Sequence, residues 1–213
     1  FIGCAISLVN GMRRGVYYTR SALVANASAD LSLKSRSIRR LSRKTIPDVI
    51  AVLSKRRIVE LDEAALKLAN KKIVYVMNYG GQPSSSNAAR LLAVNSAQSG
   101  RSIVLCDATG QAEKAIKDNP AQNSSDLPVT RIDENIVIMR GASEASFFTS
   151  KNFNKAIKDL AGRFDQVFLC SNNKNGHLGL MALSEFNPGL VIIAGLRRTK
   201  KININNKKTR QPI

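Results

Sequence analysis

Tryptophan is absent from this chain of 213 residues, histidine occurs once, and only three cysteines are present. Cys4, Cys106 and Cys170 lie far apart inside apolar runs, so no CxxC pair exists and no zinc site is predicted. Such cysteines are typical of buried, reduced thiols in a cytosolic domain. His177 lies in a polar stretch without a second histidine or a base–nucleophile pair. The sequence therefore predicts no metal site and no catalytic residue.

Acidic residues are scarce at both ends of the chain, whose formal net charge is +18. Residues 10–57 hold twelve Lys and Arg against two acids, and residues 197–213 hold seven against none. Residues 58–196 hold fourteen against thirteen, so the excess charge lies on two flanks of a nearly neutral centre. Charge alone does not separate anionic lipid from nucleic acid as the partner. Residues 25–44 contain no aromatic residue, which argues against a stacking platform for single strands.

No charge occurs in the first nine residues, FIGCAISLV, and two arginines and two tyrosines follow between residues 13 and 18. Nine residues cannot span a bilayer, which needs about 20. The chain opens on Phe1 rather than Met, so we expect a piece of a longer protein. We interpret residues 1–12 as the end of a transmembrane helix and 13–57 as a basic cytoplasmic linker. A trimmed signal peptide and a buried helix end are the alternatives.

Residues 58–200 alternate short apolar runs with amphipathic segments, which predicts one α/β domain. Strands are predicted at 73–77, 103–106, 135–139, 165–170 and 190–194. Helices are predicted at 60–70, 87–99, 150–162 and 180–186, with Gly100 ending the second and a polar loop at 171–179. Strands that are apolar on both faces favour a doubly wound, mostly parallel sheet between two helix layers. Residues 201–213 are predicted to form a basic, disordered tail.

The loop YGGQPSSSN at 79–87 lies between the first strand and the following helix, the usual place for a phosphate. A phosphate-binding loop has the pattern GxxxxGK[ST], whose lysine neutralises phosphate oxygens and whose hydroxyl holds Mg²⁺. Here Ser84, Ser85 and Ser86 stand in place of Gly-Lys-Ser/Thr, and the loop contains no lysine. The arrangement of a nucleotide site is present without its main cation.

Two interpretations of this loop stay open. Gly80, Gly81 and the three serines could bind a phosphate weakly through backbone N–H groups and hydroxyls, with Asp107 at the end of the next strand. Alternatively, the loop is a simple turn in which Ser84 or Ser85 caps the helix. We prefer the second interpretation, because the loop contains no lysine that could neutralise a phosphate.

The order of these segments resembles the cytoplasmic domain of bacterial polysaccharide co-polymerases, the chain-length determinant proteins whose ATPase-like domain is a tyrosine kinase. The resemblance covers about two thirds of the chain, and its segments are ELDEAALKLAN (60–70), SGRSIVLCDA (99–108), NIVIMRGA (135–142), SKNFNKAIKDLAGRFDQVFLC (150–170) and PGLVIIAGLRRTKK (188–201). It implies a P-loop NTPase-like fold of three αβα layers behind a membrane-spanning helix. It also implies a place on the cytoplasmic side of the bacterial inner membrane.

The residues at the family's site differ here. Ser85 stands near the lysine position and Ser86 near the position of the magnesium-binding hydroxyl. Asp107 matches the first aspartate of the family, whereas Thr109 and Cys170 stand where two further aspartates belong. Phosphoryl transfer depends on a cationic side chain at the phosphates and on carboxylates that bind the metal ion. The loss of these groups therefore argues against catalysis.

The family kinases also carry C-terminal tyrosines as phosphate acceptors, and no tyrosine follows Tyr79 here. The resemblance implies a catalytically degenerate, membrane-tethered, tyrosine-kinase-like domain in exopolysaccharide or capsular polysaccharide chain-length control or export, with no required cofactor. Its implied partners are anionic lipid at the basic flanks, the polysaccharide export or polymerisation machinery, and other copies of itself. One alternative is an active kinase or ATPase that binds ATP and Mg²⁺ through a divergent loop. Another is a basic, partition-ATPase-like protein that binds DNA through residues 34–57 and 197–213, against which the apolar start argues.

Overall fold

The computed structural model describes residues 40–41, 44–79, 85–109, 129–140, 145–172 and 174–194. The predicted membrane-helix end, most of the basic linker, the tail and the loop residues Gly80, Gly81 and Ser84 lie outside the described residues. None of the helices within the described ranges has the length and apolar character needed to cross a membrane.

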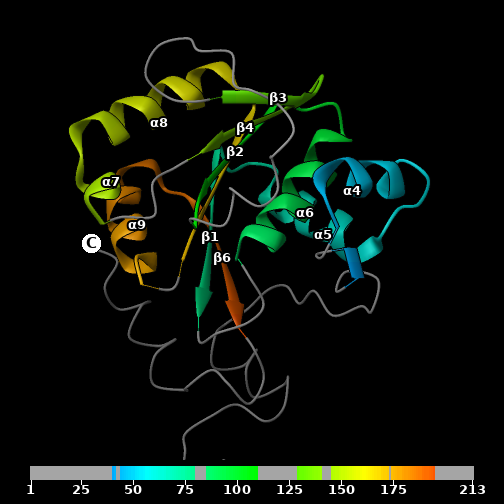
Figure 1. The fold of residues 1–213 in the computed structure, drawn as a ribbon, viewed down its shortest axis with the longest axis horizontal. Coiled ribbons are helices and arrows are strands. Elements are labelled where there is room, and N and C mark those ends of the chain that lie inside the picture. Colours follow the sequence, from blue (N-terminus) through cyan, green and yellow to red (C-terminus); the bar gives the residue numbers. More distant parts are fainter. Residues whose placement is uncertain are drawn as a thin grey trace, which may run out of the picture.

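Six strands form one sheet in the order β3–β4–β2–β5–β1–β6 (Figure 1). Their bounds are β1 Ile73–Tyr79, β2 Ile103–Ala108, β3 Val129–Asp133, β4 Ile136–Arg140, β5 Gln166–Ser171 and β6 Gly189–Ala194. All neighbours are parallel except β3, which runs antiparallel to β4 at one edge. The five predicted strands are confirmed, and the carboxyl ends of β1, β2 and β5 share one end of the sheet.

Helices cover both faces of the sheet, which confirms the predicted three-layer α/β class (Figure 1). One face carries α4 Ile46–Leu53, α5 Val59–Leu68 and α6 Ser85–Ala97. The other carries α7 Ala145–Thr149, α8 Lys151–Arg163, α9 Gly176–Ala182 and the short 3₁₀ helix Ser184–Phe186. Two apolar clusters fill the spaces between the layers, one on each side of the sheet.

Several boundaries near the carboxyl end of the sheet differ from the predicted ones, and β1 for example continues to Tyr79 rather than 77. Helix α6 begins at Ser85 rather than 87. Strand β2 continues through Asp107 to Ala108, because these two residues still pair with Cys170 and Ser171 of β5. Helix α9 begins at Gly176, inside the predicted loop 171–179; glycine and asparagine favour loops, but tertiary packing overrides that local preference.

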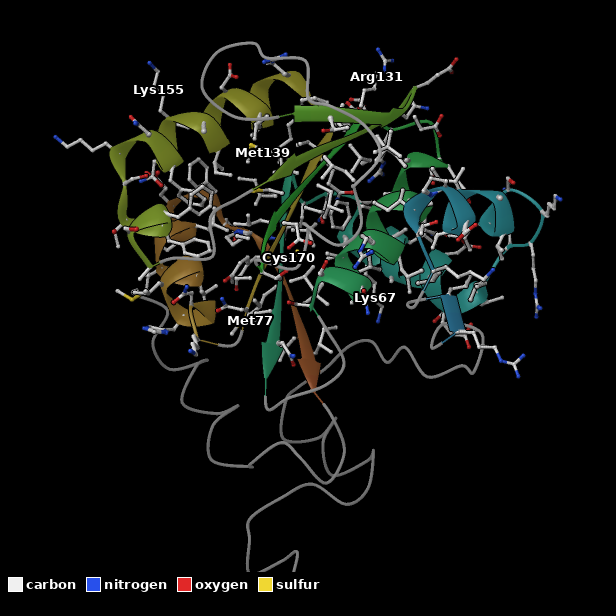
Figure 2. The ribbon with its side chains drawn as sticks, in the orientation of Figure 1. Lys67, Met77, Arg131, Met139, Lys155 and Cys170 are labelled. Carbon is white, nitrogen blue, oxygen red and sulfur yellow. The ribbon has the colours of Figure 1, made fainter. Side chains whose placement is uncertain are left out.

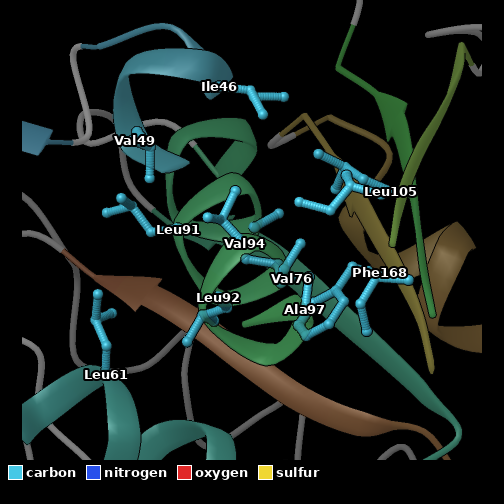
Figure 3. Packing of buried hydrophobic residues seen from close by; sticks show 14 of the residues in the cluster. Ile46, Val49, Leu61, Val76, Leu91, Leu92, Val94, Ala97, Leu105 and Phe168 are labelled. Carbon is cyan, nitrogen blue, oxygen red and sulfur yellow. The ribbon is translucent and has the colours of Figure 1, made fainter. Parts of the chain in front are cut away.

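Helix α6 is buried on nearly all sides, since ten of its thirteen residues are buried. One side contacts β1, β2 and β5, and the other contacts α4 and α5, so the helix lies between two layers. Figure 3 shows Leu91, Leu92 and Val94 among the apolar side chains of this cluster. A helix with apolar and small residues all round needs such cover. On α5, Asp62 Oδ1 accepts a hydrogen bond of 3.2 Å from Asn95 Nδ2 of α6.

Part of that cover comes from α4, which lies within the predicted basic linker 13–57. Helix α4 buries Ile46, Val49 and Leu53 in the same apolar cluster as α6. Thr45 caps the helix by accepting a hydrogen bond from the backbone N–H of Asp48. The packed part of the chain therefore starts before residue 58.

On the opposite face, α9 approaches β1 closely at a glycine. The fully buried Tyr75 hydroxyl donates to the carbonyl of Gly176 at 3.0 Å and lies 2.5 Å from Ser171 Oγ. A Cβ at Gly179 would lie 2.7 Å from Cζ of Tyr75 and closer still to its hydroxyl. The helix can occupy this position only without a side chain at residue 179.

We therefore expect Gly179→Ala to lower the free energy of unfolding by about 1–3 kcal/mol, because the Tyr75 ring is held in place and cannot yield. Urea denaturation followed by circular dichroism would measure the change. Gly162→Ala in α8 is the matched control, since nothing lies within 4 Å of the added Cβ. It should raise stability by up to about 1 kcal/mol. Equal effects of both substitutions would contradict the role assigned to Gly179.

Candidate functional site

The candidate site lies where the N-terminus of α6 meets the carboxyl ends of β2 and β5. Ligands of open α/β sheets bind at this end of the strands. Ser85 and Ser86 are the first two residues of α6, and Asp107 is the penultimate residue of β2. All three are buried, with at most 5% of each residue exposed. Of the six predicted site residues, these three are described, and the structure brings them together.

Asp107 is the centre of a small hydrogen-bonded cluster. Its Oδ2 accepts a short hydrogen bond from the Ser86 hydroxyl. Its Oδ1 accepts from the backbone N–H of Thr109 at 3.0 Å and from the Thr109 hydroxyl at 2.5 Å. Both carboxylate oxygens are thus engaged by donors of the chain itself, and the N-terminus of α6 adds a favourable dipole.

A cation joins this cluster from the next turn of α6. Arg90 donates from Nη2 to the Ser86 hydroxyl at 3.3 Å and to Asn87 Oδ1 at 2.7 Å. Its Nε donates to the Ser86 carbonyl at 3.4 Å. Hydrogen bonds therefore run in one direction, from the guanidinium through Ser86 to Asp107. From the sequence alone, Arg90 is only a polar neighbour of the loop 79–87, and its position one helical turn after Ser86 is the signal for its contact with that serine.

Ser85, which stands near the lysine position, is hydrogen-bonded to the sheet rather than to Asp107. The Ser85 hydroxyl donates to the carbonyl of Ser171, at the end of β5, at 2.6 Å. This bond ties the start of α6 to the strand between β1 and β2. Ser85 is 2% exposed, so its hydroxyl serves the packing of α6 against the sheet.

Two buried thiols lie close to Asp107 along the strands, one on each face of the sheet. Cys170 is paired with Asp107 in the register of β5 and β2, and Figure 2 shows it near the middle of the fold. Burial, and then the charge of Asp107, raises the pKa of the Cys170 thiol well above its usual value. Burial likewise raises the pKa of Cys106, whose side chain belongs to the apolar cluster on the opposite face. Both groups are therefore protonated at neutral pH, and the burial predicted for these two cysteines is confirmed.

Half of the predicted site residues fall outside the ranges that the structure describes. Gly80, Gly81 and Ser84 lie outside the described residues. His177 is an exposed residue of α9 rather than of a loop. Within the described ranges, no group of three His, Cys, Asp or Glu residues could hold a metal ion.

Known proteins offer only structural likeness. No protein-family model and no curated protein matches the sequence. The BceF tyrosine kinase domain is 10% identical with a TM-score of 0.60, and the match covers 92% of this chain and 93% of that one. The VpsO kinase domain is 11% identical with a TM-score of 0.58, covering 78% and 88%. The chimerical protein CapA2B2 is 14% identical with a TM-score of 0.63, covering 90% and 92%.

These identities are too low to carry more than the fold. The chain has the fold of these kinase domains, which confirms the predicted P-loop NTPase-like class and, at the level of fold, the resemblance seen in the sequence.

Two serines of α6 provide a test of the cluster. Ser86→Ala should lower the free energy of unfolding by about 1.5–3 kcal/mol, since it removes a donor to a buried carboxylate. Ser96→Ala should be neutral or stabilising by up to about 1 kcal/mol, because its buried hydroxyl has no hydrogen-bond partner among the residues that the structure describes. Urea denaturation measures both changes. A Ser86→Ala variant as stable as Ser96→Ala would contradict the geometry described here.

Proposed function

We propose that this chain is a catalytically degenerate, tyrosine-kinase-like domain, tethered to the cytoplasmic face of the bacterial inner membrane, that acts in polysaccharide chain-length control or export. Its role is then assembly with other copies of itself and with the polysaccharide machinery rather than phosphoryl transfer. The kinase fold supports the choice of family, and the internal hydrogen bonding of Asp107 is the observation that supports the loss of catalysis.

A kinase fold implies a site for Mg²⁺ and ATP, and the residues present do not fit that group. Phosphoryl transfer needs a cation at the phosphates and carboxylates free to hold the metal. Ser85 stands at the lysine position and its hydroxyl is bonded to a backbone carbonyl. Thr109, at a second carboxylate position, donates to Asp107 instead of adding a negative charge. A protonated thiol, Cys170, occupies the third position.

Within the described ranges, the Ser86–Asp107 pair favours the second candidate, an active nucleotide-binding domain. A hydroxyl and a carboxylate are both oxygen ligands of the kind Mg²⁺ accepts. The two candidates differ in whether those oxygens can leave their present hydrogen bonds for a metal ion and a nucleotide.

Isothermal titration of ATP into the full chain, with and without Mg²⁺, separates them. We expect no binding heat at millimolar ATP in either buffer, because the sequence of the loop at 79–87 contains no lysine to neutralise the phosphates. The Asp107→Ala variant is the control. Micromolar, Mg²⁺-dependent binding to the wild type that Asp107→Ala abolishes would overturn the loss of catalysis and restore the kinase or ATPase interpretation.

The tether is supported by the distribution of charge. Most of the positive excess lies on the flanks of the nearly neutral domain, and Lys55, Arg56 and Arg57 at the folded end of the N-terminal flank are exposed. Basic residues close to an anionic bilayer contribute roughly 1 kcal/mol each, and salt screens that attraction.

Sedimentation with anionic vesicles should therefore show binding of the full chain at low salt that weakens as salt is added. Replacing Lys55, Arg56 and Arg57 by Gln should weaken binding about tenfold or more. Replacing the exposed Lys151, Lys155 and Lys174 removes the same charge elsewhere on the domain and should have a smaller effect. Binding to duplex DNA but not to vesicles would instead favour the basic DNA-binding alternative.

A further inference from the structure

The buried carboxylate of Asp107 needs compensation that neutral donors supply only in part. Asp107 is 5% exposed, and a buried carboxylate is costly unless hydrogen bonds and an opposite charge accompany it. Ser86 and Thr109 contribute neutral donors. Among the described residues, Arg90 is the cationic side chain that hydrogen bonds connect to this carboxylate, through the Ser86 hydroxyl.

The direction of those bonds makes the connection effective. The guanidinium has only donors, so Arg90 Nη2 must give a hydrogen to the Ser86 oxygen, and the Ser86 hydroxyl is then free to give its own to Asp107. A charged donor at one end and a charged acceptor at the other polarise the hydroxyl between them. Asn87 Oδ1 accepts a second hydrogen bond from Arg90 Nη2 at 2.7 Å and helps to hold the guanidinium over the first turn of α6.

We infer that Arg90, acting through Ser86, supplies the positive charge at Asp107 that a divalent metal ion would supply in a metal-dependent site. The charge of Asp107 is then compensated without a metal ion. Arg90 is a positioning residue: it holds Ser86 on the carboxylate and keeps Asp107 from accepting Mg²⁺. Removing the guanidinium leaves a carboxylate and a hydroxyl, two oxygen ligands that a divalent cation can take.

The inference rests on the proposed lack of a metal-dependent nucleotide site, but the two can fail separately. Mg²⁺-dependent ATP binding by the wild type would overturn the proposed function. The test of Arg90 uses no nucleotide and measures the stability of the full chain against Mg²⁺.

Thermal unfolding should give three results. Wild-type protein should unfold at the same temperature in EDTA and in millimolar Mg²⁺. In EDTA, Arg90→Ala should unfold roughly 3–10 °C lower, since a charge-assisted hydrogen bond is lost. Mg²⁺ should then raise its midpoint in a saturable way, because an ion that binds only the folded state stabilises it. Arg90→Lys, which keeps the charge, should recover part of the loss and show no response to Mg²⁺.

Two controls separate this role from general charge loss. Arg163→Ala removes an exposed arginine that pairs with Asp159 on α8, and it should change neither the midpoint nor its response to Mg²⁺. Arg90→Ala combined with Asp107→Asn should lose the response to Mg²⁺. The inference is wrong if Arg90→Ala is as stable as wild type, or if Mg²⁺ does not change the unfolding midpoint of Arg90→Ala.

Metal binding by the wild-type chain tests the inference even if Arg90→Ala fails to fold. Electron paramagnetic resonance of Mn²⁺ added to the wild-type chain reports bound metal without any change at Arg90. We expect the same binding by wild type and by Asp107→Asn. Mn²⁺ bound by the wild type and lost in Asp107→Asn would show that Arg90 does not exclude a metal, and would overturn the inference.

Discussion

The enclosure of α6 is the constraint on which the rest of the structure depends. The helix has the sheet on one side and α4 and α5 on the other, so its position leaves little freedom of translation or rotation. Its small residues, such as Ala89, Ala93 and Ala97, permit close approach, and its leucines and valine fill the space between layers. Because α6 cannot shift, the hydroxyls at its N-terminus have fixed partners: Ser85 on the last residue of β5 and Ser86 on Asp107.

Asp107 and Tyr75, two polar groups on opposite faces of this end of the sheet, have hydrogen-bond partners within the chain, whereas the buried Oδ1 of Asn78 in β1 has none among the described residues. On the α6 face, Asp107 takes donors from Ser86 and Thr109. On the α9 face, the Tyr75 phenol donates to the Gly176 carbonyl, and burial raises the pKa of the Tyr75 phenol above its usual range, so it stays neutral. Internal satisfaction of this kind stabilises the fold, but it leaves fewer groups available to a ligand. The same hydrogen bonds that complete the packing therefore weaken the case for a nucleotide site.

The sequence was sufficient for the parts of the fold that are set by local pattern. Apolar runs identified the five parallel strands. Gly100, predicted to end the helix 87–99, has the expected left-handed φ of +82°, but the helix itself ends earlier, at Ala97. Strand β3 was missed, because VTRID alternates weakly and pairs only with β4 at the edge. The short helix α7 was missed for a similar reason: its burial rests on Phe148, and five residues carry little periodic signal. These elements depend on contacts between distant segments, which no local pattern contains.

The site was predictable only in part, and the reason is geometric. Spacing placed Ser85, Ser86 and Asp107 at one end of the sheet, but it could not tell which serine would face the carboxylate. Residues one apart on a helix point about 100° from each other, so Ser86 reaches Asp107 while Ser85 reaches β5. A lysine at residue 85 would have to bury its ammonium where a hydroxyl now fills a space with 2% exposure. The close packing of α6 on β5 therefore depends on a small side chain at residue 85. A lysine there would require the start of the helix to move away from the strand.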